Sequence, residues 1–417
     1  MSKFNLARTA WSGRAVALST LTLIGSSAQA GIDPLSVTVS ESVSYDNNYL
    51  RNDNAKKSEL VSATSLTLAL DKSYGRQRYT LSATGTAQRN RNYKQFSNDG
   101  YSVAASLSSS IGANSYGALA AQAGKSLQNP DEQSGVRQAQ DISTRTASSY
   151  LLHGLYSRLG GTASLQTSKT EYSLTREQDK QQVGGRVGVR YNPSDRVSFD
   201  LGYKRSDVEL VNITTAARKI NRSDIDLNTS WFVSGYTNLR GSVAFSRERR
   251  PGTQGFDFDG VTGSLSWDFT PGGRTSYGVS FSRDTSNAGQ GTSISVQSDA
   301  TTVASFSNPT QNLLTNTLSA SLRYSLTSKV KLAAGMSYSQ YSNVLNASST
   351  SVTQLNDISG FEKASVDTVG LNTGFSFQPY RMVSMGCNLQ AYSRGKSRLG
   401  PSYKGEALGC TASLTLD

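Results

Sequence analysis

The sequence has little apolar content and no long hydrophobic run after its first thirty residues. Only 36% of the 417 residues are apolar, and the mean hydropathy is −0.42. A membrane-spanning helix needs roughly 18 or more apolar residues in succession, so the chain after residue 30 contains no such helix. Low hydropathy is also typical of disorder, but 20 Tyr, 13 Phe and 3 Trp argue against a disordered chain.

Histidine and cysteine are scarce as well, with one His and two Cys. There is no clustered Cys/His set for zinc or iron, no P-loop and no G-x-S-x-G sequence. The single histidine, His153, lies beside Leu151 and Leu155, and we interpret it as a residue of a strand wall rather than a catalytic base. We therefore expect no enzyme activity and no cofactor.

Acidic and amide side chains gather in two places that resemble loops. None of these groups has the spacing of an EF-hand, so we interpret them as turn formers rather than Ca²⁺ ligands and expect no metal site. The residues are Asp46, Asn47, Asn48, Asp257 and Asp259.

The N-terminal segment has the pattern of a secretory signal peptide. Basic residues precede an apolar run over residues 15–24, and the small-x-small sequence Ala28-Gln29-Ala30 follows. The apolar run is too short to span a membrane. We predict a cleaved signal over residues 1–30, with no cysteine placed to carry a lipid anchor.

The clearest structural pattern lies between Val183 and Arg205. Apolar residues alternate there with Gly, Arg, Ser and Asp, which is the period of a β-strand with one apolar and one polar face. Asn192-Pro193-Ser194-Asp195 interrupts the alternation with turn-forming residues. This segment predicts a β-hairpin, and the rest of the chain repeats the pattern.

Eighteen alternating segments follow one another along the chain, and short and long connections between them alternate. Bacterial outer-membrane barrels have this arrangement, with short periplasmic turns and longer external loops. A soluble sandwich with ordinary core aromatics is the alternative, but it has no reason to sort its connections by length. The segments are residues 35–46, 60–70, 78–88, 101–112, 116–127, 148–159, 162–174, 182–191, 196–208, 223–234, 237–247, 261–270, 274–284, 313–326, 329–341, 365–377, 381–393 and 404–416.

We therefore predict an all-β fold, a transmembrane antiparallel barrel of about 18 strands (16 to 18) over residues 31–417, located in the bacterial outer membrane. Hydrocarbon offers no partner to backbone polar groups, so only a closed sheet can cross it as strands. Aromatic residues near strand ends would form the interfacial girdles. These are Tyr79, Tyr101, Tyr150, Tyr191, Tyr203, Trp267, Phe269, Tyr324, Tyr338 and Phe377.

The formal net charge is +12, and strand periodicity assigns several cations to the barrel interior. Against them the same periodicity places Asp200 and Asp268, so we expect a basic lumen that attracts an anionic solute. The alternative is that these cations lie at the rims, where they bind lipopolysaccharide phosphates or neighbouring carboxylates. The scattered charge and the lack of a recognition helix argue against nucleic acid. The assigned cations are Arg78, Arg186, Arg190, Lys204, Arg240, Arg323 and Lys331.

Cys387 and Cys410 lie in the last two predicted strands, equidistant from a loop centred near residue 399. Apolar neighbours place both on the outward face. An oxidising periplasm favours a disulfide between them, whereas directly paired strand cysteines are often strained, so both the bridged and the free forms stay open.

The start of the predicted mature chain resembles the exopolysaccharide-operon outer-membrane barrels, the EpsL-type members of the β-barrel porin 2 group. Tyr45, Asp46, Asn47, Asn48, Leu50 and Arg51 carry this resemblance, and YNPSDRVSFDLGYKRSD is similar to later hairpins of the family. The resemblance implies a role in carrying polysaccharide across the outer membrane.

Three functional hypotheses follow. The first is a passive conduit for an anionic exopolysaccharide, with lipids and lipopolysaccharide around it and periplasmic export components at its turns. The second is an adhesin or matrix receptor that acts through the long loops at 285–312 and 342–364. The third is a general porin for small solutes.

Overall fold

The structure, a computed structural model, describes residues 35–128, 139–212, 219–249, 251, 257–285, 313–343, 365–396 and 402–416. The predicted signal peptide and most of the two longest predicted loops lie outside these residues. The described chain forms eighteen strands. They are β1 (Leu35–Asp46), β2 (Glu59–Tyr74), β3 (Gln77–Asn90), β4 (Asn98–Ile111), β5 (Ser115–Leu127), β6 (Asp141–His153), β7 (Leu159–Tyr172), β8 (Lys180–Ser194), β9 (Val197–Leu210), β10 (Lys219–Ser234), β11 (Thr237–Arg249), β12 (Phe258–Phe269), β13 (Thr275–Thr285), β14 (Leu313–Ser325), β15 (Val330–Asn343), β16 (Ser365–Tyr380), β17 (Val383–Arg394) and β18 (Tyr403–Leu416).

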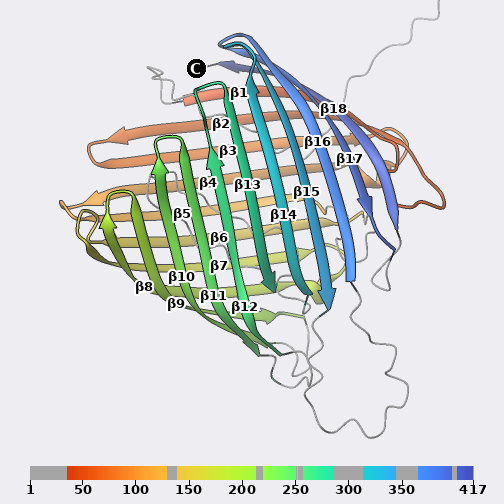
Figure 1. Cartoon of the computed structure of the whole chain (residues 1–417). Helices are drawn as coiled ribbons and strands as arrows, with labels where there is room; N and C mark the ends of the chain where they lie inside the picture. Colours follow the sequence, from red (N-terminus) through yellow and green to blue (C-terminus); the bar gives the residue numbers. More distant parts are fainter. Residues whose placement is uncertain are drawn as a thin grey trace, which may run out of the picture.

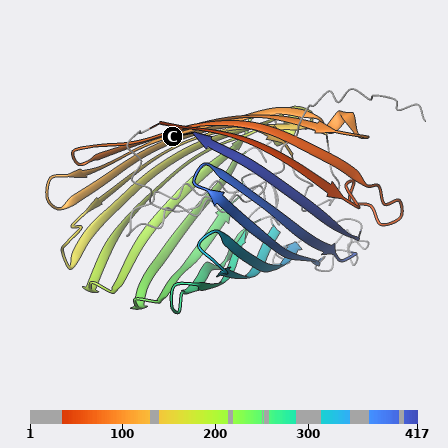
Figure 2. The same cartoon turned by 90° about the horizontal axis from the view of Figure 1, so that it is seen from above.

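All eighteen strands belong to one closed antiparallel sheet. Each strand pairs with its neighbours in the sequence, and β1 pairs with β18 from Val37 opposite Leu416 to Asp46 opposite Ala407. Strands of the front and rear walls cross in Figure 1, as expected for strands that tilt around a barrel axis. Figure 2 shows β1 and β18 side by side where the sheet closes. The predicted barrel and its strand number are confirmed.

Short and long connections separate to opposite ends of the barrel. Residues 75–76, 195–196 and 235–236 are examples at the short-turn end, whereas residues 47–58 and 91–97 lie at the long-loop end. Within the described residues, helix is limited to two 3₁₀ turns, η1 (Lys94–Phe96) and η2 (Arg176–Gln178). None of the described helices has the length and apolarity of a membrane span.

The sixth and seventh strands begin earlier than the sequence predicts, and Gly160-Gly161 is not a turn. The turn between β6 and β7 lies at residues 154–158, because Gly154 adopts a left-handed conformation with φ +80°. The backbone N–H groups of Gly154 and Leu155 both donate to the Asn114 carbonyl. A Cβ at Gly160 would lie 2.5 Å from the His153 carbonyl oxygen, so this glycine permits a close approach of two strands rather than a turn.

The hairpin of β8 and β9 is present as predicted, with its turn moved by two residues. The pairing shifts register between Tyr191 and Ser194, so the Asn192-Pro193 sequence lies in an irregular end of β8. Proline has no N–H to donate, and a strand end or bulge tolerates that loss. The turn itself is at residues 195–196.

Candidate functional site: the inner wall of the barrel

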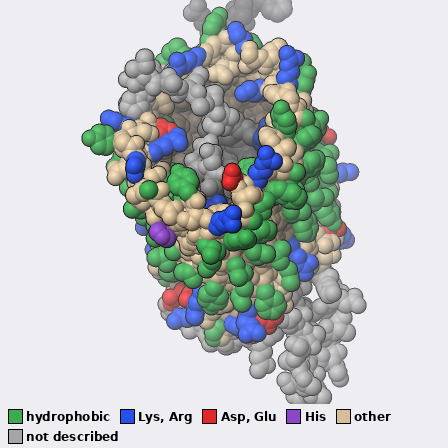
Figure 3. Space-filling view, turned by 60° about the vertical axis from the view of Figure 1, so that its left-hand side comes forward, with side chains coloured by type: hydrophobic (Ala, Val, Ile, Leu, Met, Phe, Trp, Pro, Cys, Tyr) green, Lys and Arg blue, Asp and Glu red, His purple; other side chains and the backbone are tan. Residues whose placement is uncertain are grey.

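The alternation of side chains identifies the outward and inward faces of each strand. On β8, Val183, Val187 and Val189 are more than half exposed, whereas Lys180 and Arg186, at even-numbered positions of the same strand, are buried. Exposed large apolar side chains recur at every second position around the sheet, and hydrophobic side chains cover the outer wall in Figure 3. The polar positions therefore line the inner wall, as in membrane barrels with a wet interior.

In the middle of the inner wall, Arg186 is held by two carboxylates from neighbouring strands. Its Nε donates to Asp226 at 2.9 and 3.1 Å, and its Nη2 donates to both Asp226 and Asp200. Nη1 donates to the Thr162 hydroxyl at 3.1 Å. With all three nitrogens engaged, the guanidinium is fixed against the wall.

Glycine provides the space for this arginine. A Cβ at Gly202, on β9, would lie 2.5 Å from Cζ of Arg186, and one at Gly188 would lie 2.9 Å from its Nη1. The guanidinium therefore lies flat over positions that have no side chain. This explains the alternation of Gly and Arg in the Val183 to Arg205 segment in terms of packing.

A second buried group surrounds Arg222, nearer the long-loop end. Arg222 forms ion pairs of 2.8 Å with Asp224 and with Asp284, and its Nη2 donates to the Ser246 hydroxyl at 3.1 Å. Lys204 lies 3.8 Å from the same Asp224 carboxylate. These residues come from β9, β10, β11 and β13, so the group extends over the neighbouring strands from β9 to β13. We call the two groups together the buried network; its charged members are Arg186, Asp200, Lys204, Arg222, Asp224, Asp226 and Asp284.

The cations at the short-turn end are in a different environment. Arg78 pairs with Asp71, and Arg240 lies 3.6 Å from Asp268, but each of these side chains is about half exposed. Such pairs are surrounded by water and contribute little to stability.

Three inward cations at this end have no ion pair with any described residue. They are Arg190, Arg323 and Lys331, and Arg190 donates only to the Asn192 side-chain oxygen at 3.0 Å. We call them the mouth cations. Lys and Arg side chains surround the hollow in Figure 3. Further cations lie in the short turns, namely Arg76, Arg158, Arg196, Arg274, Lys329 and Arg381.

The structure therefore divides the seven predicted lumen cations into three groups. Arg186 and Lys204 belong to the buried network, Arg78 and Arg240 are in exposed ion pairs, and only Arg190, Arg323 and Lys331 are unpaired among the described residues. The inner wall also contains carboxylates that the sequence did not predict there, namely Asp71, Asp224, Asp226 and Asp284. Arg222 was also missed, because the predicted strand began at residue 223, whereas β10 begins four residues earlier at Lys219.

The last two strands are joined covalently. Cys387 and Cys410 are directly opposite each other, with a Cα–Cα distance of 4.0 Å, and form a disulfide in the structure. Exposed Met385, Leu389 and Leu408 share their face. The bridge therefore lies on the outward face, away from the charged inner wall.

The segment that carries the family resemblance lies where the barrel closes. Asp46 accepts hydrogen bonds from the Asn48 N–H and the Tyr392 hydroxyl and pairs with Arg51 at 2.9 Å. Arg51 stacks 3.6 Å above the Tyr392 ring, with its own φ at +59°. Asn48 also donates to the Lys404 carbonyl at 2.9 Å. The segment thus joins β1 to β17 and β18, and we call it the seam clamp.

His153 lies on β6, as the sequence predicts, and contacts the neighbouring strand β5. The His153 Nδ1 is 2.9 Å from the Ser115 hydroxyl on the neighbouring strand. No group of three or more His, Cys, Asp or Glu residues in the described ranges could hold a metal ion.

Comparisons with known proteins add to the evidence for the fold. No family model matches the sequence, and no curated protein matches it. Among solved structures, Pseudomonas aeruginosa OpdQ has a TM-score of 0.50 at 11% identity over 92% of this chain and 99% of its own. P. aeruginosa OccK1 (OpdK) also has a TM-score of 0.50, at 12% identity over the same shares. At such low identity the comparisons establish the fold alone: the chain is a closed antiparallel barrel of 18 strands.

Proposed function

We propose that this protein is an outer-membrane channel through which an acidic exopolysaccharide leaves the cell. The observation that carries the proposal is the set of mouth cations, which line the inner wall near the short turns and form no ion pair with any described residue. A barrel of this strand number is wide enough to enclose an aqueous channel.

The position of the mouth cations suits the entry of a polymer from the periplasm. Short turns of bacterial outer-membrane barrels face the periplasm, so the mouth cations would meet the polymer first. Low-dielectric walls focus the field of unpaired charges and raise the local concentration of an oppositely charged solute.

The same cations would not hold the polymer tightly. An exposed ion pair contributes only about 0 to 1 kcal/mol, so each carboxylate can be exchanged as the chain advances. Farther along the wall, the buried network already pairs its cations with Asp200, Asp224, Asp226 and Asp284. The mouth cations therefore favour capture of the anionic polymer at the short-turn end, and the paired charges of the buried network let it pass farther along the channel.

The choice of an exopolysaccharide over smaller anions rests on the resemblance carried by Tyr45, Asp46, Asn47, Asn48, Leu50 and Arg51. The structure uses these residues in the seam clamp rather than in the channel. The mouth cations thus support anion transport, and the resemblance supports the class of anion.

A deletion strain tests the proposal. It is complemented with the natural chain, with the triple variant Arg190→Gln/Arg323→Gln/Lys331→Gln, or with Arg240→Gln/Asp268→Asn as a charge-balanced control at the same end. We expect polymer to collect in the periplasm in the deletion strain and in the triple variant, but not in the control. Normal surface polysaccharide in the deletion strain would refute the proposal. Loss of small-anion uptake with normal polysaccharide would instead indicate a general porin.

A further inference from the structure

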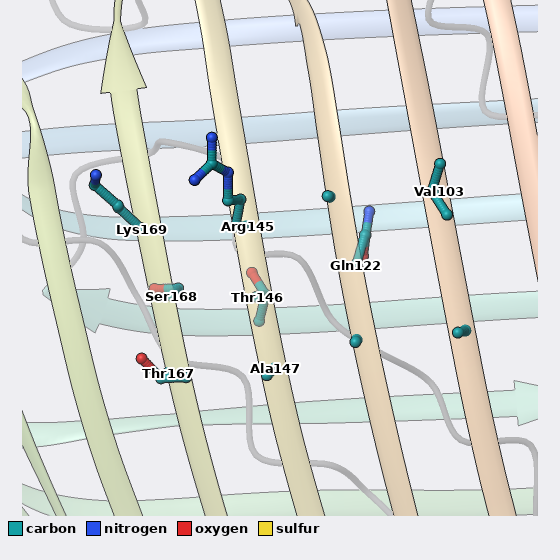
Figure 4. A pocket seen from close by; sticks show the side chains of 11 residues that line it. Val103, Gln122, Arg145, Thr146, Ala147, Thr167, Ser168 and Lys169 are labelled. Atoms are coloured by element: carbon teal, nitrogen blue, oxygen red, sulfur yellow. The ribbon is translucent and has the colours of Figure 1, made fainter.

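The outward face of β4 to β7 contains a hollow that the channel does not use. Its volume is about 390 Å³, and Figure 4 shows its lining on four adjacent strands. Its floor is a row of paired residues, with Ala105 opposite Ala121, Ala121 opposite Ala147, and Ala147 opposite Thr167. We call it the outer groove.

Larger apolar side chains close the groove on its short-turn side. The adjacent outward row contains Leu107 opposite Leu119, and Leu165 farther along. Leu119 and Leu165 are both more than half exposed on this face. The hollow is therefore a local depression beside larger apolar side chains of the same face.

Two cations stand together on the long-loop side of the groove. Arg145 and Lys169 are directly opposite each other in the pairing of β6 and β7, and they lie side by side at the upper end of Figure 4. Their side chains are 66% and 43% exposed. Glu171 lies 2.8 Å from Lys169 and 3.9 Å from Arg145.

The charge around this end remains positive. Lys125, on the outward face of β5, pairs with Asp141 at 2.7 Å. The group thus contains three cations and two carboxylates, so Glu171 and Asp141 do not neutralise it. An outward position at the end of an apolar wall is where lipid headgroups lie.

We propose that the outer groove binds a phosphorylated glycolipid of the outer leaflet, with one acyl chain on the alanine floor and a phosphate between Arg145 and Lys169. Hydrocarbon fills an apolar hollow on a lipid-facing wall without a desolvation cost, so an acyl chain is the expected occupant of the alanine floor. The arginine fork and the lysine ammonium are the groups that bind phosphate best, which accounts for the headgroup.

The leaflet follows from the direction of the strands. Arg145 and Lys169 lie toward the long-loop end, and long loops of such barrels face the outside. The site therefore faces the leaflet in which phosphorylated glycolipids reside. The inference requires the barrel to lie in the membrane, but it does not require the channel to export a polymer.

Native mass spectrometry of the full-length protein in detergent, titrated with bisphosphorylated lipid A, tests this site. Arg145→Gln/Lys169→Gln removes the headgroup contacts, and Ala121→Leu/Ala147→Leu fills the groove with side chains that face lipid and do not disturb the inner wall. Arg205→Gln is the matched control, an outward cation at the long-loop end of β9 that does not line the outer groove.

We expect each double variant to weaken lipid A binding by about tenfold or more, and the control to change it less than twofold. Dephosphorylated lipid A should bind the natural chain as weakly as bisphosphorylated lipid A binds the Arg145→Gln/Lys169→Gln variant. Unchanged affinity in the groove-filling variant, or equal binding of lipid with and without phosphate, would overturn the proposal. The proposal would also be overturned if the natural protein formed a dimer that the groove-filling variant lost while its lipid A binding stayed unchanged. That result would identify a second copy of the protein as the occupant of the groove. Polysaccharide export plays no part in this readout, so the two proposals fail separately.

Discussion

The two halves of the inner wall use the same residue types in opposite ways. In the buried network, Arg222 and Asp224 are 8% and 3% exposed, and each cation contacts a carboxylate. At the short-turn end, Arg240 and Asp268 are 51% and 54% exposed, and the mouth cations form no ion pair with any described residue. A buried and paired charge is compensated by its partner and stabilises the wall, whereas an exposed, unpaired charge can attract a solute of opposite sign.

The physical reason is the cost of desolvation. A buried charge without a partner is strongly unfavourable, so a charge that leaves water must be paired. An exposed charge keeps its hydration and needs no partner, and its pairing contributes little. The two ends of the barrel should therefore respond very differently to the loss of one charge.

The largest effect is expected in the buried network. Arg222→Met removes one cation and leaves Asp224 and Asp284 without their shortest ion pairs, so we expect the barrel to lose about 3 to 5 kcal/mol of stability. Urea unfolding of the refolded protein in detergent measures this loss. Arg323→Met, an exposed cation on the same wall, is the control; equal losses in the two variants would remove the distinction between the halves.

Removal of the disulfide should change the stability of the barrel without changing the charge of its inner wall. It closes a loop with a sequence separation of 23 residues, for which the chain-entropy estimate is about 3 kcal/mol. Cys387→Ser/Cys410→Ser should lower stability by roughly that amount and leave the ion selectivity unchanged, because the bridge lies on the outward face. Complete thiol labelling of the natural chain without reductant would show that the bridge does not form.

The seam clamp is expected to have an intermediate effect. Asp46→Asn weakens the ion pair with Arg51 while keeping the size of the side chain, so we expect a loss of about 1 to 3 kcal/mol. Hydrogen exchange should report this loss first at β1 and β18, where the barrel closes. A loss spread evenly over all strands would argue against a local clamp.

The smallest effect is expected for the exposed pair at the short-turn end. Arg240→Gln/Asp268→Asn should change stability by less than about 1 kcal/mol, because both side chains are already hydrated. The variant keeps the net charge, so the channel should keep its ion preference. A loss comparable to that of Arg222→Met would show that exposure does not separate the two ends.

The barrel could be predicted from the sequence because an apolar outer face and a polar inner face give each strand a period of two. Val183, Val187 and Val189 alternate with Gly and Arg, so the alternation itself predicts which side chains face outward and which face the interior. The alternation of short and long connections then determined the topology. These signals are local, so a single sequence contains them.

The pairing of the inner charges could not be predicted in the same way. Arg222 contacts Asp284, which is 62 residues away, and the contact depends on the register of β10 to β13. The predicted strand began four residues after the start of β10, which placed Arg222 in a loop in the prediction. The turn at Gly154 was missed for a related reason, since a close approach between strands and a turn both require glycine.

The reversal potential of the reconstituted channel in a KCl gradient tests the central claim most directly. The natural chain should prefer Cl⁻ over K⁺, and Arg190→Gln/Arg323→Gln/Lys331→Gln should abolish most of that preference. Arg186→Gln/Asp226→Asn, in which a cation and a carboxylate of the buried network are neutralised together, should leave it nearly unchanged. A natural channel that prefers cations, or a triple variant that keeps the preference for Cl⁻, would contradict the claim that the unpaired charges at the short-turn end govern which solutes enter.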